Sequence, residues 1–298
     1  MAFTGTKSGP GPAAATQSPD PFLIRIRDLI YQVAGIFHPD SKLYFLQDRC
    51  KRRMTARDLS SIQEYLDALT IKADRERELQ LLLNEITVGE TSFFRNQPQL
   101  DALRKFILPE LLREKERLGY QRLRIWSAGC STGEEPYTLA MILLEEMQAR
   151  HANWQIEVFA TDINEKSLAK ARQGQYAAYA LRNVSRPLLE KYFTPAGDGQ
   201  FLVREEPRAL VSFQHLNLFD ERRLMFLRGL DLILCCNVLI YFDAESKRRM
   251  IQHFYNMLQP HGYLFLGHAE SLFGINDDFR LVHYPGATAY ARSRRSLS

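Results

Sequence analysis

The sequence is poor in cysteine and has no long apolar run. Four of its 298 residues are cysteine, and two of these, Cys235 and Cys236, are adjacent. This number and spacing argue against a zinc site, or any other metal site, and against a disulfide scaffold. No run approaches the length of a membrane span, and the amino-terminal residues lack the basic and then apolar pattern of a secretion signal. We therefore expect a cytoplasmic protein with reduced thiols that is not inserted in a membrane.

The chain also lacks a strong net charge. It carries 39 basic and 35 acidic residues, a formal charge of +4 at pH 7. A charge this small does not by itself indicate nucleic-acid binding, so any electrostatic function has to come from local clustering. The hydrophobic content of 45% is ordinary for a globular protein. The length suffices for one large domain or two modest ones.

Composition and periodicity then divide the amino-terminal third of the chain. Residues 1–20 are rich in Gly, Pro, Ala, Ser and Thr and cannot bury apolar surface, which predicts a disordered tail. Residues 21–96 show only helical spacing of their apolar positions and predict a helical domain followed by a linker. Within it, Thr55 is a candidate N-cap for the helix in "TARDLSSIQEYLDAL".

Residues 97–298 predict a second domain of the α/β class. From Gln121 onwards, short apolar runs alternate with helical patterns, which is typical of a mostly parallel, doubly wound sheet. A final strand pair predicts an antiparallel hairpin at the edge of that sheet. The alternation is interrupted by a Gly-rich turn and short strand-like runs, which predict a small β-subdomain inserted at about 193–213.

The stretch "IWSAGCSTGEEPYTLA" predicts a ligand loop between a strand and a helix. Gly129 and Gly133 would let the backbone approach a ligand at the carboxyl end of the strand. The loop is not a GxGxxG motif, and Glu134 and Glu135 would repel a pyrophosphate at the helix N-terminus. A ligand with positive charge or hydroxyl groups suits it better. Alternatively, both acids only complement the helix dipole.

A second acid, Asp162, ends the next predicted strand in "EVFATDINEKSLAKAR". In nucleotide-binding α/β folds, an acid at this position holds ribose hydroxyls, although Asp162 could equally be an acid near the helix cap. Asn164 is the expected cap itself. Together, the glycine loop and Asp162 indicate a site for an adenosine-like ligand that carries a ribose and a cationic group. The sequence shows no evident phosphate-binding loop beside them. S-adenosylmethionine, with its sulfonium and amino-acid tail, fits this description.

Two further stretches carry polar groups among apolar ones. "CCNVLIYF" places Asn237 and Tyr241 at a strand end, and "EITVGETSFFRN" places Thr91 and Arg95 just before the α/β domain. Each stretch also has a purely structural interpretation. The first could be an ordinary buried strand end, and the second could consist of core phenylalanines and a surface arginine.

These segments, in this order, resemble the CheR family of chemotaxis-receptor methyltransferases. The matching stretches are "TVGETSFFRN", "IWSAGCSTGEEPYTLAM", "FATDINEKSLAKAR" with "GQY", and "CNVLIYF" with "LQPHGYLFLGHAESL". The resemblance extends from about residue 22 to 292. It implies a helical domain and a Rossmann-like S-adenosylmethionine-dependent methyltransferase domain with an inserted β-subdomain. It also implies methyl transfer to glutamate side chains of chemoreceptors, which yields glutamyl methyl esters and S-adenosylhomocysteine.

By motif, the resemblance implies a set of cofactor contacts: Thr91, Arg95, Glu135, Asp162 at the ribose, Asn217 and Leu218 near the adenine, Cys236 and Asn237. Two positions depart from the family pattern. Gly89 stands where the family commonly has Asn, and Cys236 stands where it commonly has Arg. Loss of an arginine at 236 removes a charged anchor from the pocket.

The implied chemistry needs no general base, because a glutamate side chain has a pKa of about 4.3 and is already an anion at neutral pH. The enzyme has to orient the carboxylate and strip water from it. A guanidinium is suited to holding a carboxylate in a fixed plane. Arg95 is the first candidate for this catalytic role, with the Tyr241 hydroxyl as its partner.

A basic stretch, "LQDRCKRRMTAR", is the candidate surface for an acidic substrate helix. The residues expected to bind it are Arg49, Arg52, Arg53 and Arg57, although the same pattern also fits a solvated helix face. The resemblance implies an acidic helical methylation region as partner, and leaves open a receptor tail peptide at the β-subdomain. We expect a monomer that does not bind nucleic acid. The alternatives are a nucleic-acid methyltransferase and a non-catalytic signalling scaffold that binds S-adenosylmethionine.

Overall fold

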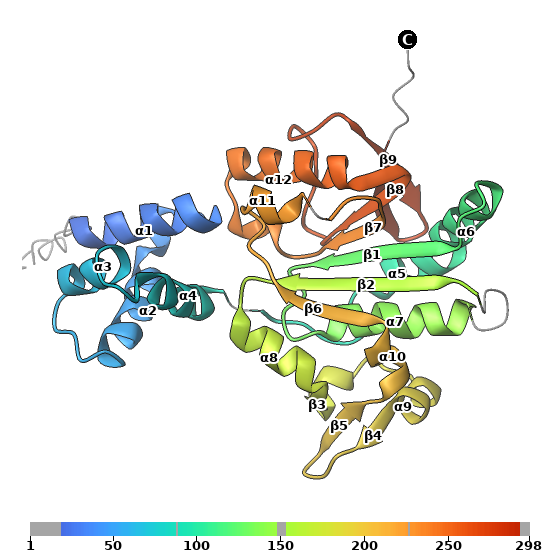
Figure 1. Ribbon diagram of the computed structural model, residues 1–298, viewed down its shortest axis with the longest axis horizontal. Coiled ribbons are helices and arrows are strands. Elements are labelled where there is room, and N and C mark those ends of the chain that lie inside the picture. The colour runs from blue at the N-terminus through green and yellow to red at the C-terminus, as the bar shows by residue number, and fades with distance from the viewer. Residues whose placement is uncertain (1–18, 88, 148–152, 226, 293–298) are drawn as a thin grey trace, which may run out of the picture.

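The computed structural model describes residues 19–87, 89–147, 153–225 and 227–292 (Figure 1). Most of the tail predicted for residues 1–20 lies outside the described residues. Asp20 is described, and its side chain accepts a hydrogen bond from the Phe22 amide at 2.8 Å, which caps the first helix. Within the described part, no helix is both long enough and apolar enough to span a membrane.

The amino-terminal domain is helical, as predicted. Its helices are α1 (Pro21–Ala34), α2 (Leu43–Thr55), α3 (Ile62–Thr70) and α4 (Arg75–Ile86). They pack around fully buried side chains that include Ile26, Ile30, Leu46, Tyr65 and Leu82. In Figure 1 this domain lies to the left of the sheet.

The predicted N-cap at Thr55 is wrong. Thr55 is the last residue of α2, and Asp58 has a φ of 54°, which interrupts the helical path. The next helix begins after Ser61, whose hydroxyl accepts from the Glu64 amide at 3.1 Å. The Glu64 carboxylate in turn accepts from the Ser60 amide at 2.9 Å. This reciprocal pairing satisfies amides that would otherwise be free at the helix start.

The second domain opens with a helical stretch that comprises α5 (Gln97–Ala102), a π-helical turn (Leu103–Ile107) and α6 (Leu108–Arg117). The main sheet follows, and its seven described strands lie in the order β6-β2-β1-β7-β8-β10-β9. Their bounds are β1 (Arg122–Ala128), β2 (Gln155–Asp162), β6 (Val211–His215), β7 (Leu230–Cys235), β8 (Leu258–Leu266), β9 (Phe279–Tyr284) and β10 (Ala287–Arg292).

The pairing confirms a mostly parallel sheet with an antiparallel hairpin at one edge. Strands β6, β2, β1, β7 and β8 run parallel, whereas β10 pairs antiparallel with both β8 and β9. The connecting helices include α7 (Glu134–Met147), α8 (Glu165–Gln173), α11 (Glu221–Leu224) and α12 (Ala244–Met257). The strand order reverses at β1, so the carboxyl ends of β1, β2 and β7 enclose the position where such sheets bind ligands.

The inserted β-subdomain begins earlier and ends earlier than the range 193–213 that the sequence predicted. Among the described residues, its antiparallel sheet has the order β3 (Gln175–Ala177), β5 (Gln200–Val203), β4 (Phe193–Pro195). Helices α9 (Arg186–Tyr192) and α10 (Glu205–Ala209) complete it. Val211 already belongs to β6 of the main sheet. A strand as short as β3 has no readable periodicity, which explains why the sequence placed the boundary late.

The end of α1 is fastened to the carboxyl edge of the main sheet. Ile36 forms a β-bridge with Phe242, and the Phe37 amide donates to the Tyr241 carbonyl at 2.9 Å. The Tyr31 hydroxyl donates to Asp243 at 2.9 Å. These contacts place the helical domain over the sheet edge where the ligand site was expected.

Candidate functional site

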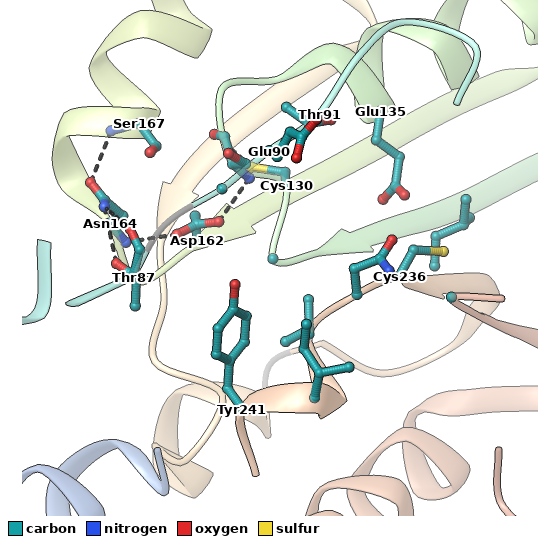
Figure 2. Close-up of a pocket in the computed structure, with 18 of the residues that line it drawn as sticks. Thr87, Glu90, Thr91, Cys130, Glu135, Asp162, Asn164, Ser167, Cys236 and Tyr241 are labelled. Carbon is teal, nitrogen blue, oxygen red and sulfur yellow. Dashed lines mark hydrogen bonds between the residues drawn. The ribbon is translucent and has the colours of Figure 1, made fainter. Parts of the chain in front are cut away.

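A cavity of about 730 Å³ lies between the carboxyl edge of the main sheet, the linker and the end of α1 (Figure 2). Its volume is in the range of small-molecule sites. Every residue that the sequence predicted for cofactor binding or catalysis lines it: Thr91, Arg95, Glu135, Asp162, Asn217, Leu218, Cys236, Asn237 and Tyr241. The structure therefore brings together side chains that are up to 150 positions apart in the chain.

The glycine loop between β1 and α7 needs both of its glycines. Gly129 has a φ of 79°, and a Cβ there would lie 2.5 Å from the Val238 side chain. Gly133 has a φ of 95°, and a Cβ there would lie 2.8 Å from Ala171. The amides of Gly129 and Cys130 donate to the Thr161 carbonyl at 2.8 and 2.9 Å. The loop is thus held against the end of β2, with its backbone close to the cavity.

Asp162 fastens this loop from the end of β2. Its carboxylate accepts from the Ser131 amide and from the Asn164 amide, both at 2.7 Å. Burial raises the pKa of Asp162, against the opposing effect of these backbone hydrogen bonds. The cap of α8 is Asn164, whose side chain accepts from the Ser167 amide at 3.0 Å. Asp162 is therefore not the cap, and Figure 2 shows it facing the cavity.

The two acids of the loop have different surroundings. Glu134 is 4% exposed and accepts from the Thr132 hydroxyl at 2.7 Å, and it is not among the lining residues. Glu135 lines the cavity and accepts from the Ser127 hydroxyl at 2.6 Å. Burial raises the pKa of Glu135, because no cation offsets the lost hydration in full. A cationic ligand group in the cavity would favour its charged form.

The Cys236 thiol contributes an uncharged group to the cavity lining near Glu135. Its sulfur lies 3.6 Å from the Gln99 side-chain oxygen. Burial and the nearby Glu135 carboxylate raise the pKa of Cys236 well above its ordinary value. The thiol is therefore protonated at neutral pH and unreactive as a nucleophile. Position 236 therefore contributes no charge to the cavity.

The linker presents Arg95 from a strongly constrained segment. Phe94 and Asn96, on either side of it, have φ values of 50° and 66°. Phe93 is fully buried and packs edge-on against Tyr176 and Phe193 of the β-subdomain. The Arg95 guanidinium donates to the Glu90 carbonyl at 2.6 Å, and its side chain lines the cavity. The constrained backbone on both sides of Arg95 fixes the position of its Cα, from which the long, flexible side chain extends.

Tyr241 reaches the cavity from the opposite side. It ends a 3-10 turn, Leu239–Tyr241, that follows β7. Figure 2 shows its hydroxyl pointing toward the side of the cavity where Asp162 lies. Burial raises the pKa of Tyr241, as do the charges of Asp162 and Glu270, while Arg95 opposes the shift. The hydroxyl is therefore protonated at neutral pH and can donate a hydrogen bond.

Among the lining residues that the sequence did not predict, Ser92 and Ser131 stand out. The hydroxyls of Ser92 and Ser131 are buried and have no hydrogen-bond partner among the described residues. Such hydroxyls cost free energy unless a ligand or water pairs with them. Gly89 is linked to one of them, because a Cβ at position 89 would overlap the Ser131 hydroxyl. This glycine leaves room for the Ser131 side chain.

The basic stretch on α2 does not reach the cavity. Arg53 donates twice to the buried Glu78 carboxylate, at 3.0 and 2.9 Å. Arg57 pairs with the same carboxylate at 3.1 Å and with Asp74 at 2.7 Å. Arg49 and Arg52 pair with Asp48. The side chain of Arg52 is 58% exposed, whereas that of Arg53 is only 15% exposed, so two of the four arginines already have a structural task.

The part of the chain that the structure describes contains no group of three or more His, Cys, Asp and Glu side chains arranged to hold a metal ion. The residues that line the cavity provide carboxylates, hydroxyls, thiols, side-chain amides, a guanidinium and an imidazole.

Comparison with known proteins agrees with this arrangement. The family model "CheR methyltransferase, SAM binding domain" matches residues 89–287, and "CheR methyltransferase, all-alpha domain" matches residues 23–87. Chemotaxis protein methyltransferase 2 of Vibrio cholerae is 37% identical over 274 residues, which are 92% of this chain and 93% of that protein. The chemotaxis protein methyltransferase of Escherichia coli is 35% identical over 273 residues, 91% of this chain and 90% of its own. This chain therefore belongs to the CheR methyltransferase family and is an S-adenosylmethionine-dependent methyltransferase.

Proposed function

We propose that this enzyme transfers the methyl group of S-adenosylmethionine to glutamate side chains in the acidic helical methylation region of chemoreceptors. The products are glutamyl methyl esters and S-adenosylhomocysteine. One observation carries the proposal: Arg95 and Tyr241 line the same cavity as the two carboxylates suited to the cofactor, Glu135 and Asp162. The cavity thus combines a site for a cationic nucleoside with groups that can hold an anionic acceptor.

The cofactor side of the cavity is negative, which suits the positive charges of S-adenosylmethionine. Asp162 would take the ribose hydroxyls, and Glu135 would face the ammonium of the methionine tail. The hydroxyls of Ser92 and Ser131, which have no hydrogen-bond partner in the described part of the chain, offer further hydrogen bonds. Asn217 and Leu218 also line the cavity and would contact the adenine, and the Asn217 side-chain amide donates to the Val33 carbonyl at 2.7 Å.

The acceptor side provides orientation and not proton transfer. A glutamate side chain has a pKa of about 4.3, so it arrives as the nucleophilic carboxylate. Arg95 would hold this carboxylate through its guanidinium, while the protonated Tyr241 hydroxyl donates to it or to the backbone beside it. Correct alignment inside a water-poor cavity can lower the barrier by about 7–11 kcal/mol. The methyl group supplied by the cofactor is already activated by its sulfonium.

The proposal is tested by incubating the enzyme with tritiated S-adenosylmethionine and receptor-containing membranes. We expect labelled receptor whose methyl groups are released by alkali, because esters hydrolyse in alkali whereas N-methyl groups do not. Peptide mapping would place the label on glutamate. Label that resists alkali, or that enters added nucleic acid instead of receptor, would contradict the proposal and favour a nucleic-acid methyltransferase.

Replacement of Arg95 by alanine should lower the rate of methyl transfer by more than about tenfold, a loss of about 1.4 kcal/mol or more. The reason is that the acceptor carboxylate loses its planar partner. Turnover is measured with receptor membranes, and thermal unfolding verifies that the variant is folded. Arg95→Lys is the matched control, since it keeps the charge but not the fork of donors. Near-normal turnover of Arg95→Ala would refute the assigned role.

Binding of receptor fragments should weaken as salt concentration rises, because exposed opposite charges are screened. The ion pairs of α2 refine this expectation. Arg53 and Arg57 are held by Glu78, so the exposed Arg52 should contribute more to the substrate surface. We expect Arg52→Glu to weaken binding, and Arg113→Glu on the distant α6 to leave it unchanged (Figure 1). An affinity that is flat from low to high salt would rule out an electrostatic surface.

A further inference from the structure

The carboxylate of Glu270 joins three backbone segments next to the cavity. Glu270 follows the end of β8 and is half-buried. One of its oxygens accepts from the Asn237 amide at 2.8 Å and from the Gly267 amide at 2.7 Å. The other oxygen accepts from the Ile240 amide at 3.2 Å. The carboxylate therefore ties the ends of β7 and β8 to the turn that carries Tyr241.

A carboxylate side chain suits this set of partners. All three groups are N–H donors, and a carboxylate offers acceptors at both oxygens without a donor of its own. Asn237 has a φ of 61°, an unusual conformation that the surrounding contacts have to hold. Gly267 leaves room for the arrangement, because a Cβ there would lie 2.7 Å from the Glu270 oxygen and 2.8 Å from the Asn237 amide nitrogen.

We propose that Glu270 is a positioning residue for methyl transfer, which fixes the turn from Asn237 to Tyr241 so that the Tyr241 hydroxyl faces the acceptor. This inference rests on the function proposed above, and on the role given there to Tyr241. Glu270 itself is not among the residues that line the cavity. It acts through the three backbone amides and needs no contact with cofactor or acceptor.

The simpler reading is that Glu270 only joins two strand ends. Glu270→Gln separates the two readings, because glutamine has nearly the same shape. Its single oxygen can still accept from Asn237 and Gly267, which keeps the strand ends joined. Its amino group then faces the Ile240 N–H, and two donors cannot pair. The substitution therefore releases the part of the turn that leads into Tyr241 while it preserves the rest.

We expect Glu270→Gln to lower kcat for receptor methylation about tenfold, as a small misplacement of an orienting group can do. The dissociation constant of S-adenosylhomocysteine, measured by calorimetry, should change by less than about threefold. Thermal unfolding should stay close to that of the parent enzyme. Asp277→Asn is the matched control, because it makes the same chemical change at an exposed site in the same β8–β9 connection.

Tyr241→Phe and the double variant complete the test. If Glu270 acts through Tyr241, the double variant should be no slower than Tyr241→Phe alone. A slow Tyr241→Phe together with a normal Glu270→Gln would overturn the inference and leave the function intact. A kcat loss in Glu270→Gln that only parallels lost stability would also overturn it. A parent enzyme that forms no alkali-labile product would instead overturn the proposed function.

Discussion

Replacement of Asp162 by alanine is expected to weaken the binding of S-adenosylmethionine and S-adenosylhomocysteine about a hundredfold, or by about 3 kcal/mol. The carboxylate is the proposed partner of two ribose hydroxyls, and hydrogen bonds to a charged group are the stronger kind. It also accepts from the Ser131 amide, so its loss loosens the glycine loop. Isothermal calorimetry with S-adenosylhomocysteine measures the effect directly.

Asp162→Asn serves as the graded control. The asparagine side chain has no charge, but its single oxygen can still accept from the amide of either Ser131 or Asn164. We expect its affinity to fall between those of the parent and Asp162→Ala. Circular dichroism would show that both variants are folded. An unchanged dissociation constant in Asp162→Ala would mean that the ribose lies elsewhere in the cavity.

Replacement of Glu78 by glutamine is expected to lower the free energy of unfolding by about 3 kcal/mol at neutral pH. Glu78 is 1% exposed and is the shared partner of Arg53, Arg57 and the Tyr65 hydroxyl. Although burial raises the pKa of Glu78, the hydrogen bonds from these groups outweigh burial, and the net pKa lies below its ordinary value. Removal of the charge takes from the Arg53 guanidinium its carboxylate partner, whereas Arg57 keeps Asp74.

The lowered pKa of Glu78 also sets the pH dependence of this effect. The stabilising contribution of Glu78 is present above the pKa of the unfolded chain and is lost as pH falls through the lower pKa of the folded state. The difference between parent and Glu78→Gln should therefore shrink in acid. Urea unfolding at several pH values tests this, with Glu76→Gln at an exposed site of the same helix as control. A difference that stays constant into acid would show that the charge is not the stabilising feature.

The elements that the sequence predicted well are those with a strong period. The helical spacing in α1 to α4 and the alternation of strands and helices after Gln121 identified both domains. The short β3 carries too few residues for a period, and the sequence placed the cap of α3 at Thr55, whereas the cap is Ser61. The position of this cap depends on the left-handed turn at Asp58, which no local pattern requires.

The site was predicted mainly through its glycine loop, Asp162 and the family resemblance. Side chains that act across segments were missed for a physical reason. Ser131 is recognised as a site residue only in the structure, where Gly89 leaves room for its side chain. Glu270 is recognised only there as well, because its carboxylate accepts from the amide of Asn237, which is distant in the sequence. In the same way, the arginines of α2 looked like a surface run, since nothing in their own stretch indicates that Glu78 is buried beneath them.

The attachment of α1 to the sheet edge has a consequence for the whole enzyme. Ala34 and Ile36 from the helical domain line the cavity together with residues of the methyltransferase domain. A ligand that touches both domains binds more weakly when they part, and by thermodynamic reciprocity it holds them together. S-adenosylmethionine that contacts both parts of this lining would therefore stabilise the docked arrangement of the two domains. Neither domain keeps a complete site when the chain is cut between them, and the loaded enzyme should melt as one cooperative unit.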